Sequence, residues 1–302
     1  MMRNRAEYRL AATALLLVAL GVRAEGVPHR ATVLVDAFGE PSPLHRDWGY
    51  ATLVEYGGKR ILFDTGNDAG GFARNVEALG VDLQRLDFVV ISHRHGDHTA
   101  GLARLLAIHP KVPVYVPDDE HFGGPTPRAF FERTVESLPA RMRYFGGQVP
   151  PVVPHGSPWA AAHLTRVSGT LEVAPGFRLV RNLAEAGAFT ETPELSLAID
   201  TPEGQVLVVG CSHPGIARIL HSVGAPGRHV HLLLGGLHLV TAPDAAVAQT
   251  VGRVADEFRV AEVAPGHCTG EPAFAAFQRR YGARYRYAGV GTVIALPPPE
   301  RP

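Results

Sequence analysis

Four side chains that bind divalent metals well stand within six positions of the sequence. They are His93, His95, Asp97 and His98, in the run Ser92-His-Arg-His-Gly-Asp-His-Thr-Ala-Gly101. Imidazole nitrogen and carboxylate oxygen are ligands that zinc prefers, and that iron and manganese accept to a lesser degree. Side chains two apart in extended chain point the same way, so His93 and His95 can hold one ion together. Gly96 permits a turn that carries Asp97 and His98 towards another ion, so the run predicts two adjacent metal sites.

The ligand run at 92–101 follows an apolar stretch, and three later stretches also place polar side chains directly after an apolar run. Cys211 and His213 follow residues 205–209, His238 follows 231–234, and His267 follows 260–263. We expect His213 to complete the first metal site and His267 to complete the second. Cys211 is an additional candidate ligand, because a thiolate binds zinc well. His238 precedes a helical stretch, so we expect a general acid or an anion-binding group outside the metal cluster, with a capping or packing histidine as the alternative.

The elements that must position these residues follow from the hydrophobic pattern. Short apolar, β-branched runs predict strands, and apolar residues at helical spacing predict helices. The strands are expected at 31–36, 51–56, 60–64, 87–92, 112–116, 177–180, 195–200, 205–209, 231–234 and 260–263, and the helices at 71–79, 99–108, 127–138, 216–223 and 242–258. In both halves of the chain, strand pairs lead into a histidine-bearing loop. Stacking two such halves sheet on sheet predicts an α/β fold, a four-layer αββα sandwich with helices outside.

The His-x-His-x-Asp-His run, together with Phe63-Asp64-Thr65-Gly66 upstream, resembles the signature of the metallo-β-lactamase fold superfamily. This resemblance implies the αββα fold and a dinuclear metal centre. It also implies that Asp64 orients a metal-binding histidine from behind, a support that ligating imidazoles commonly need.

Three further motifs are similar to one branch of that superfamily, named after a dihydropterin-dependent aminobenzene phosphate synthase. They are Gly210-Cys-Ser-His-Pro-Gly215, Gly235-Gly-Leu-His-Leu239 and His267-Cys-Thr-Gly270, and the likeness runs from Ala31 to Leu296. Many superfamily members place a bridging aspartate where this chain has the first of these motifs. Whether Cys211, His213 or a water bridges the two ions is left open by the sequence. The branch often carries Gly-x-Ser near Gly49-Tyr50-Ala51, and the missing serine suggests another substrate.

The amino-terminal segment predicts export. Residues 1–9 are basic and 10–22 are apolar, and Val22-Arg-Ala24 places small residues where a signal peptidase reads. We expect cleavage after Ala24, and a periplasmic or secreted protein that is not inserted in a membrane. The first 24 residues hold four arginines and one glutamate, so the remainder carries 25 basic and 28 acidic groups. This slightly acidic balance argues against nucleic acid as a partner.

The rest of the chain, 25–302, is expected to form a single metallo-β-lactamase-like domain. Residues 117–165 are rich in glycine and proline and predict a substrate-facing insertion. Cys211 and Cys268 are the only cysteines, too few for a disulfide scaffold, and the sequence leaves open whether they pair.

The function these residues predict is a metal-dependent hydrolase acting on a small ester, lactone or phosphoester. Two zinc ions would supply a metal-bound hydroxide as nucleophile, with iron or manganese as alternatives to zinc. Asp97 would orient the nucleophile, and His238 would protonate the leaving group. Export keeps a periplasmic metallo-β-lactamase as one alternative. An iron-dependent oxidoreductase and a non-catalytic metal-binding module are the alternatives of other classes.

Overall fold

The computed structural model describes residues 28–122, 139–152, 162–183, 192–224 and 228–299, with a few single positions between 132 and 159. The expected signal peptide and most of the helix expected at 127–138 lie outside these residues. Of the expected insertion, the described parts include two 3-10 turns, η3 (Ala140–Met142) and η4 (Tyr144–Gly147). Among the described residues, every helix is too short or too polar to cross a membrane.

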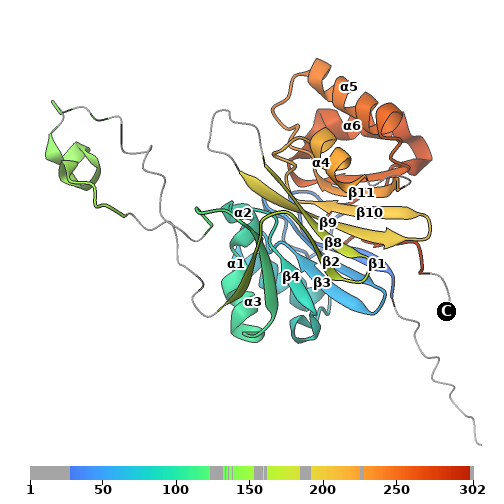
Figure 1. Ribbon diagram of the computed structural model, residues 1–302, viewed down its shortest axis with the longest axis horizontal. Helices are drawn as coiled ribbons and strands as arrows, with labels where there is room; N and C mark the ends of the chain where they lie inside the picture. The colour runs from blue at the N-terminus through green and yellow to red at the C-terminus, as the bar shows by residue number, and fades with distance from the viewer. Residues whose placement is uncertain are drawn as a thin grey trace, which may run out of the picture.

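Two mixed β-sheets form the body of the molecule (Figure 1). The first has the strand order β13-β1-β2-β3-β4-β5-β6, and the second has the order β12-β11-β10-β9-β8-β7. The strands of the first sheet are β1 (Arg30–Val35), β2 (Ala51–Tyr56), β3 (Lys59–Phe63), β4 (Phe88–Val90), β5 (Pro113–Pro117), β6 (His163–Val167) and β13 (Val293–Ala295). Those of the second are β7 (Thr170–Ala174), β8 (Phe177–Leu183), β9 (Pro193–Thr201), β10 (Gly204–Val209), β11 (Val230–Gly236) and β12 (Glu262–Gly266).

Helices cover the outer face of each sheet, as Figure 1 shows. The first sheet packs against α1 (Ala69–Ala78) and α3 (Leu102–Ile108), and the second against α4 (Ile216–Val223), α5 (Asp244–Gly252) and α6 (Glu271–Tyr281). The short elements are α2 (Gly96–Thr99), the 3-10 turns η1 (Leu83–Arg85), η6 (His267–Thr269) and η7 (Gly282–Arg284), and the π-helical turn η5 (Arg253–Glu257). The layers therefore run helix, sheet, sheet, helix, which confirms the four-layer αββα sandwich.

The alternation of side chains along each strand divides the core into three parts. On β3, Ile61 and Phe63 face the second sheet, whereas Leu62 packs under the helices of the first. On β10, Val208 faces the first sheet and Leu207 packs under the outer helices. All five side chains are fully buried. Strands that are apolar on both faces are typical of sheets covered on both sides, so the pattern explains the sandwich.

The strand directions bring the predicted site together at one edge of the sandwich. Strands β3 and β4 run parallel in the first sheet, and β10, β11 and β12 run parallel in the second. Parallel strands place their carboxyl ends at the same edge, where ligand sites of α/β sheets commonly form. The polar stretches that follow these five strands therefore meet between the two sheets.

Several elements differ from the sequence expectation, and β6, β7, β13 and α6 were not expected at all. The helix expected at 99–108 begins only with α3, after the separate turn α2, because the carbonyl oxygen of His98 accepts the N–H of Thr65 at 2.8 Å instead of the N–H of Leu102. The helix expected at 242–258 loses its α-helical hydrogen bonding after Gly252 and continues as the π-helical turn. β6 belongs to the first sheet, so the expected insertion overlaps an edge strand there.

Candidate metal centre

The first three predicted ligands come from both sheets. His93 and His95 follow β4, and His213 follows β10. The Nε2 atom of His93 lies 3.1 Å from Nδ1 of His95. The ring centre of His213 lies 4.6 Å from that of His93 and 4.8 Å from that of His95. The three imidazoles thus face one another across the seam between the sheets.

The second predicted set lies beside the first. His98 and Asp97 come from α2, and His267 opens the η6 turn after β12. One carboxylate oxygen of Asp97 lies 3.7 Å from Nε2 of His98 and 3.5 Å from Nε2 of His267. The rings of His98 and His267 meet edge to face, with their centres 4.9 Å apart. The structure therefore brings all six predicted metal ligands together.

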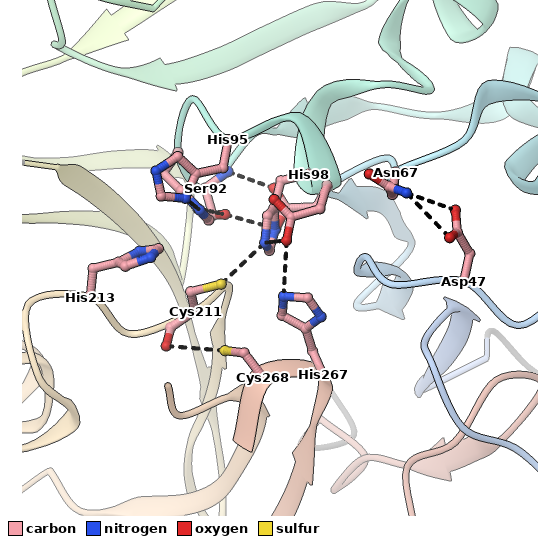
Figure 2. Close-up of polar contacts among 12 residues, drawn as sticks. Asp47, Asn67, Ser92, His95, His98, Cys211, His213, His267 and Cys268 are labelled. Carbon is pink, nitrogen blue, oxygen red and sulfur yellow. Dashed lines mark hydrogen bonds and ion pairs between the residues drawn. The ribbon is translucent and has the colours of Figure 1, made fainter. Parts of the chain in front are cut away.

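Cys211 lies between the two sets, as Figure 2 shows. Its sulfur is 3.2 Å from Nε2 of His98. The same sulfur belongs to one cluster with His93 and His213 and to another with His98 and His267, within each of which all ligand atoms lie within 4.8 Å of one another. A thiolate at this position can contact an ion in either set.

Asp64 orients two of the histidines from behind. Its carboxylate accepts a hydrogen bond of 2.7 Å from Nδ1 of His98 and one of 2.7 Å from the hydroxyl of Ser92. Because Ser92 donates its only proton to Asp64, it accepts at its oxygen from Nδ1 of His93, 2.9 Å away. Both imidazoles therefore donate a proton from Nδ1 and turn Nε2 towards the centre, the arrangement that metal-binding histidines commonly have.

Glu194 plays the corresponding part in the second sheet, and sequence reasoning missed it. Its fully buried carboxylate accepts the backbone N–H groups of Cys211, Ser212 and His213 at 2.7–2.9 Å and Nδ1 of His213 at 3.0 Å. The signal was present, because a lone acidic residue stands in the apolar run Pro193–Ile199. A buried carboxylate needs hydrogen-bonding partners, and the polar loop after β10 supplies them.

Asp36, at the end of β1, is a second supporting carboxylate that sequence reasoning missed. It is fully buried and accepts the backbone N–H of His267 at 2.9 Å and that of Ala37 at 2.7 Å. Burial raises the pKa of Asp36 to about 8. This carboxyl group holds the backbone of the η6 turn against the first sheet.

The side chain of His267 gives a test of whether the residues fit a metal. It is buried, and neither of its ring nitrogens has a hydrogen-bond partner within the described residues. Buried polar groups are normally satisfied, and an exception calls for an explanation such as an ion. The ring lies beside Asp97 and His98, which supply the other ligand atoms. The donor set therefore fits a metal ion at this position.

Burial and mutual proximity also set the protonation states of the cluster. Burial and the neighbouring imidazoles hold the pKa of His93 well below its usual value and lower that of His95 to about 4. Burial acts to raise the pKa of Asp97, but the imidazoles of His267 and His98 outweigh it and hold the pKa below its usual value. Burial acts to lower the pKa of His98, but the carboxylates of Asp64 and Asp97 outweigh it and raise the pKa to about 9. Near pH 7 the cluster thus offers neutral rings at His93 and His95 and an ionised carboxylate at Asp97, the forms that bind metals, whereas His98 must release a proton on binding an ion.

His238 lies closer to the centre than its sequence position suggested. We expected it outside the cluster, but its ring centre is 4.5 Å from that of His213. The reason is the backbone after β11, which turns at His238 with φ of 50° instead of entering a helix, and α5 begins only at Asp244. Hydrogen bonding to Cys268 raises the pKa of His238, against the effect of burial.

Backbone strain is concentrated at this edge of the fold. Among the described residues, six non-glycine residues have a left-handed backbone, and Asp64, Ser212, His238 and His267 are four of them. Such conformations cost of order 1–3 kcal/mol each and cluster at functional sites. The strand exits are held in unfavourable turns that aim these side chains inward.

Comparison with known proteins agrees with this geometry. A curated relative, 7,8-dihydropterin-6-methyl-4-(beta-D-ribofuranosyl)-aminobenzene-5'-phosphate synthase of Methanocaldococcus jannaschii, is 25% identical over 287 residues, which cover 87% of this chain and 95% of the relative. A solved structure described as a metal-dependent hydrolase of the beta-lactamase superfamily superposes with a TM-score of 0.66 at 23% identity, over 89% of this chain and 99% of that chain. Human tRNase Z, short form, superposes with a TM-score of 0.53 at 18% identity, over 89% of this chain and 99% of that one. The family model of the Metallo-beta-lactamase superfamily matches residues 49–267, more than half of the chain, and the chain therefore belongs to that superfamily.

Proposed function

We propose that this protein is an exported hydrolase that uses two metal ions, of which zinc suits the ligands best, to cleave a small ester, lactone or phosphoester. The observation that carries the proposal is that the sulfur of Cys211 joins two histidines of each predicted ligand set, His93 and His213 of the first and His98 and His267 of the second. Two adjacent ligand sets at one edge of the sandwich favour catalysis over metal storage, because storage does not require two ions side by side.

The residues divide between the two ions as follows. His93 through Nε2, His95 through Nδ1 and His213 would hold the first ion. Asp97, His98 and His267 would hold the second, with Cys211 in the bridging position. A bound pair of such ions lowers the pKa of a coordinated water and polarises the substrate oxygen.

Two residues would move or hold protons during cleavage. His238 stands at the exposed rim of the centre, and hydrogen bonding to Cys268 raises its pKa, which favours the protonated ring. It would donate that proton to the leaving oxygen of the substrate. Asp97 is ionised and reaches both His98 and His267, so a free lone pair of its carboxylate can accept a hydrogen bond from the attacking water and orient it.

A cavity beside His213 and His238 supports the proposal of a small substrate. It has a volume of about 270 Å³ and is lined by His213, His238, Leu237, Leu239 and Ile216, among others. This volume is slightly below the range typical of ligand pockets. Its apolar wall suits a short acyl or alkyl group, and the polar edge faces the metal ligands. The phosphate in the name of the methanogen relative keeps phosphoesters within the proposed class.

The proposal is tested by metal content and by turnover in matched variants. The purified protein should carry close to two zinc ions per chain and hydrolyse at least one member of a panel of chromogenic phosphodiesters, esters and lactones. His95→Ala and His267→Ala should each lose metal and turnover, while His163→Ala, an exposed position on β6, should keep both. Full activity in either ligand variant would overturn the assignment.

Two further measurements separate the remaining parts of the proposal. Hydrolysis of nitrocefin but of no ester, lactone or phosphoester would favour a β-lactamase instead. Amino-terminal sequencing of the protein recovered outside the cytoplasm should begin at Glu25, because the signal is expected to end at Ala24. An intact amino terminus on protein that stays in the cytoplasm would refute export.

A further inference from the structure

Three soft or borderline ligands occupy the ends of three neighbouring strands in the second sheet. Cys211 follows β10, His238 follows β11 and Cys268 follows β12, and these strands lie side by side in that order. Both cysteines are free and buried. The two sulfurs and a ring nitrogen of His238 all lie within 4.8 Å of one another. This cluster contains only one of the residues used above to hold the two ions, namely Cys211.

The backbone holds the three residues in this arrangement. The carbonyl oxygen of Cys268 accepts hydrogen bonds of 3.1 Å from the N–H groups of Leu239 and Val240, which ties the loop carrying His238 to the η6 turn. The sulfur of Cys268 also lies 3.6 Å from the carbonyl oxygen of Cys211. The loops after all three strands are therefore fixed relative to one another before any ligand arrives.

The sulfur of Cys268 lies in space that is open because residue 236 is glycine. Gly236 ends β11, and a Cβ at this position would lie 2.8 Å from that sulfur. Any larger residue would also clash with the carbonyl oxygen of Gly210 at 2.5 Å, so the space beside the sulfur depends on glycine. His238 is exposed, so the third ligand faces solvent and leaves a path by which an ion can enter.

The spacing suits a single ion between the two sulfurs. A metal–thiolate bond is about 2.3 Å long, so two thiolates on one ion lie at most about 4.6 Å apart. The two sulfurs lie within 4.8 Å of each other, so at most a small movement would bring both onto one ion. Two thiolates and one imidazole form a softer donor set than the histidines and the aspartate of the two-ion centre, and soft thiolate sets select ions such as Cu(I).

We propose that Cys211, Cys268 and His238 form a third metal site, next to the two-ion centre, which takes a soft thiolate-binding ion of the Cu(I) class. Cys211 would then link this ion to the two-ion centre. The inference concerns binding alone and does not depend on hydrolysis. A loaded third site would also occupy His238 and remove the proton donor from the rim.

The test is a Cu(I) titration of the full mature chain with its native metals in place. The protein is reduced with a phosphine, kept free of oxygen and titrated against a chromophoric Cu(I) chelator, with zinc and copper measured after desalting. We expect one copper per chain, two sulfur neighbours in its X-ray absorption spectrum and an unchanged zinc content. No copper binding, one sulfur neighbour, or release of zinc in exchange for copper would each overturn the proposal.

Three variants identify the ligands. Cys268→Ser should weaken Cu(I) binding by at least about 100-fold, because loss of a ligand exceeds the 10–100-fold cost of losing a supporting partner. His238→Asn, at an exposed position, should weaken it by about 10-fold or more, because loss of a ligand costs at least as much as the loss of one supporting partner. His95→Ala should bind Cu(I) as the wild type does, even though it impairs the two-ion centre. Wild-type affinity in both Cys268→Ser and His238→Asn would refute the site, whereas loss of copper in His95→Ala alone would place the copper in the two-ion centre.

Discussion

Replacement of Glu194 by glutamine would test whether a buried carboxylate organises the loop after β10. Each carboxylate oxygen of Glu194 accepts two hydrogen bonds, one oxygen from Cys211 and Ser212 and the other from the backbone and ring of His213. Burial acts to raise the pKa of Glu194, but these donors outweigh it and hold the pKa below the usual value. The carboxylate is therefore ionised at neutral pH.

The amide of glutamine keeps one acceptor oxygen and presents an NH₂ group to the other two donors. Each buried donor left without an acceptor costs about 1–3 kcal/mol, so Glu194→Gln should lower the free energy of unfolding by about 2–6 kcal/mol. If the amide turns its NH₂ towards His213, the ring loses the partner that fixes its orientation. We then expect the affinity of the first metal site for zinc to fall by about 10–100-fold.

Urea unfolding of the metal-free protein measures the first effect, and zinc competition with a chromophoric chelator measures the second. Glu203→Gln is a matched control in the turn before β10, where the carboxylate is 59% exposed and lies 3.6 Å from His231. Its stability should change by no more than about 0.5 kcal/mol. If Glu194→Gln unfolds at the same urea concentration as Glu203→Gln and binds zinc as the wild type does, the role assigned to Glu194 is wrong.

Four other substitutions have expected outcomes that follow from the structure. Asp64→Asn should weaken zinc binding by about 10–100-fold, because His98 would lose its carboxylate acceptor; unchanged affinity in the chelator competition would contradict this. Gly101→Ala should lower the free energy of unfolding by about 1–3 kcal/mol, because its Cβ would lie 2.4 Å from a backbone oxygen. Gly252→Ala, in a helix with open space, should instead raise it by about 0.4–1 kcal/mol, and equal changes in both variants would refute the packing argument. Burial acts to raise the pKa of Asp200, but hydrogen bonds from Gln205 and Arg228 outweigh it and hold the pKa below its usual 3.8. This carboxylate therefore stabilises the fold above that pH, and its contribution is lost as the pH falls through the folded pKa. Asp200→Asn should therefore lower stability by at most about 1 kcal/mol at pH 7 and converge with the wild type in acid, and a difference that grows below pH 4 would contradict the sign.

The sequence predicted the layers and most of the ligand positions because both depend on local patterns. The apolar run before His93 and the one before His213 each identify a buried strand, and a strand's end is where its loop begins. A motif of four ligands in six positions needs no long-range information. For these features the expected elements and the observed ones agree to within a few residues.

The rest of the site could not be predicted because it depends on contacts between distant segments. Glu194 lies 17 positions before Cys211 in the sequence, and Asp36 lies 231 positions before His267. Nothing in the local pattern shows which loop a buried carboxylate will meet. His238 was misplaced for a related reason: the apolar run of β11 identifies the strand, but not the left-handed turn that follows it.

The four left-handed residues at the strand exits link stability to activity, because the strained backbone lowers stability at the positions that form the centre. At Asp64, Ser212, His238 and His267, glycine would adopt the same backbone at almost no steric cost. A library of variants selected only for heat resistance should therefore accumulate glycine at these positions. At Asp64, His238 and His267 such a change would delete a side chain that the proposed centre uses. Mutagenesis for thermostability should therefore exclude these positions, because substitutions that raise heat resistance there would lower turnover.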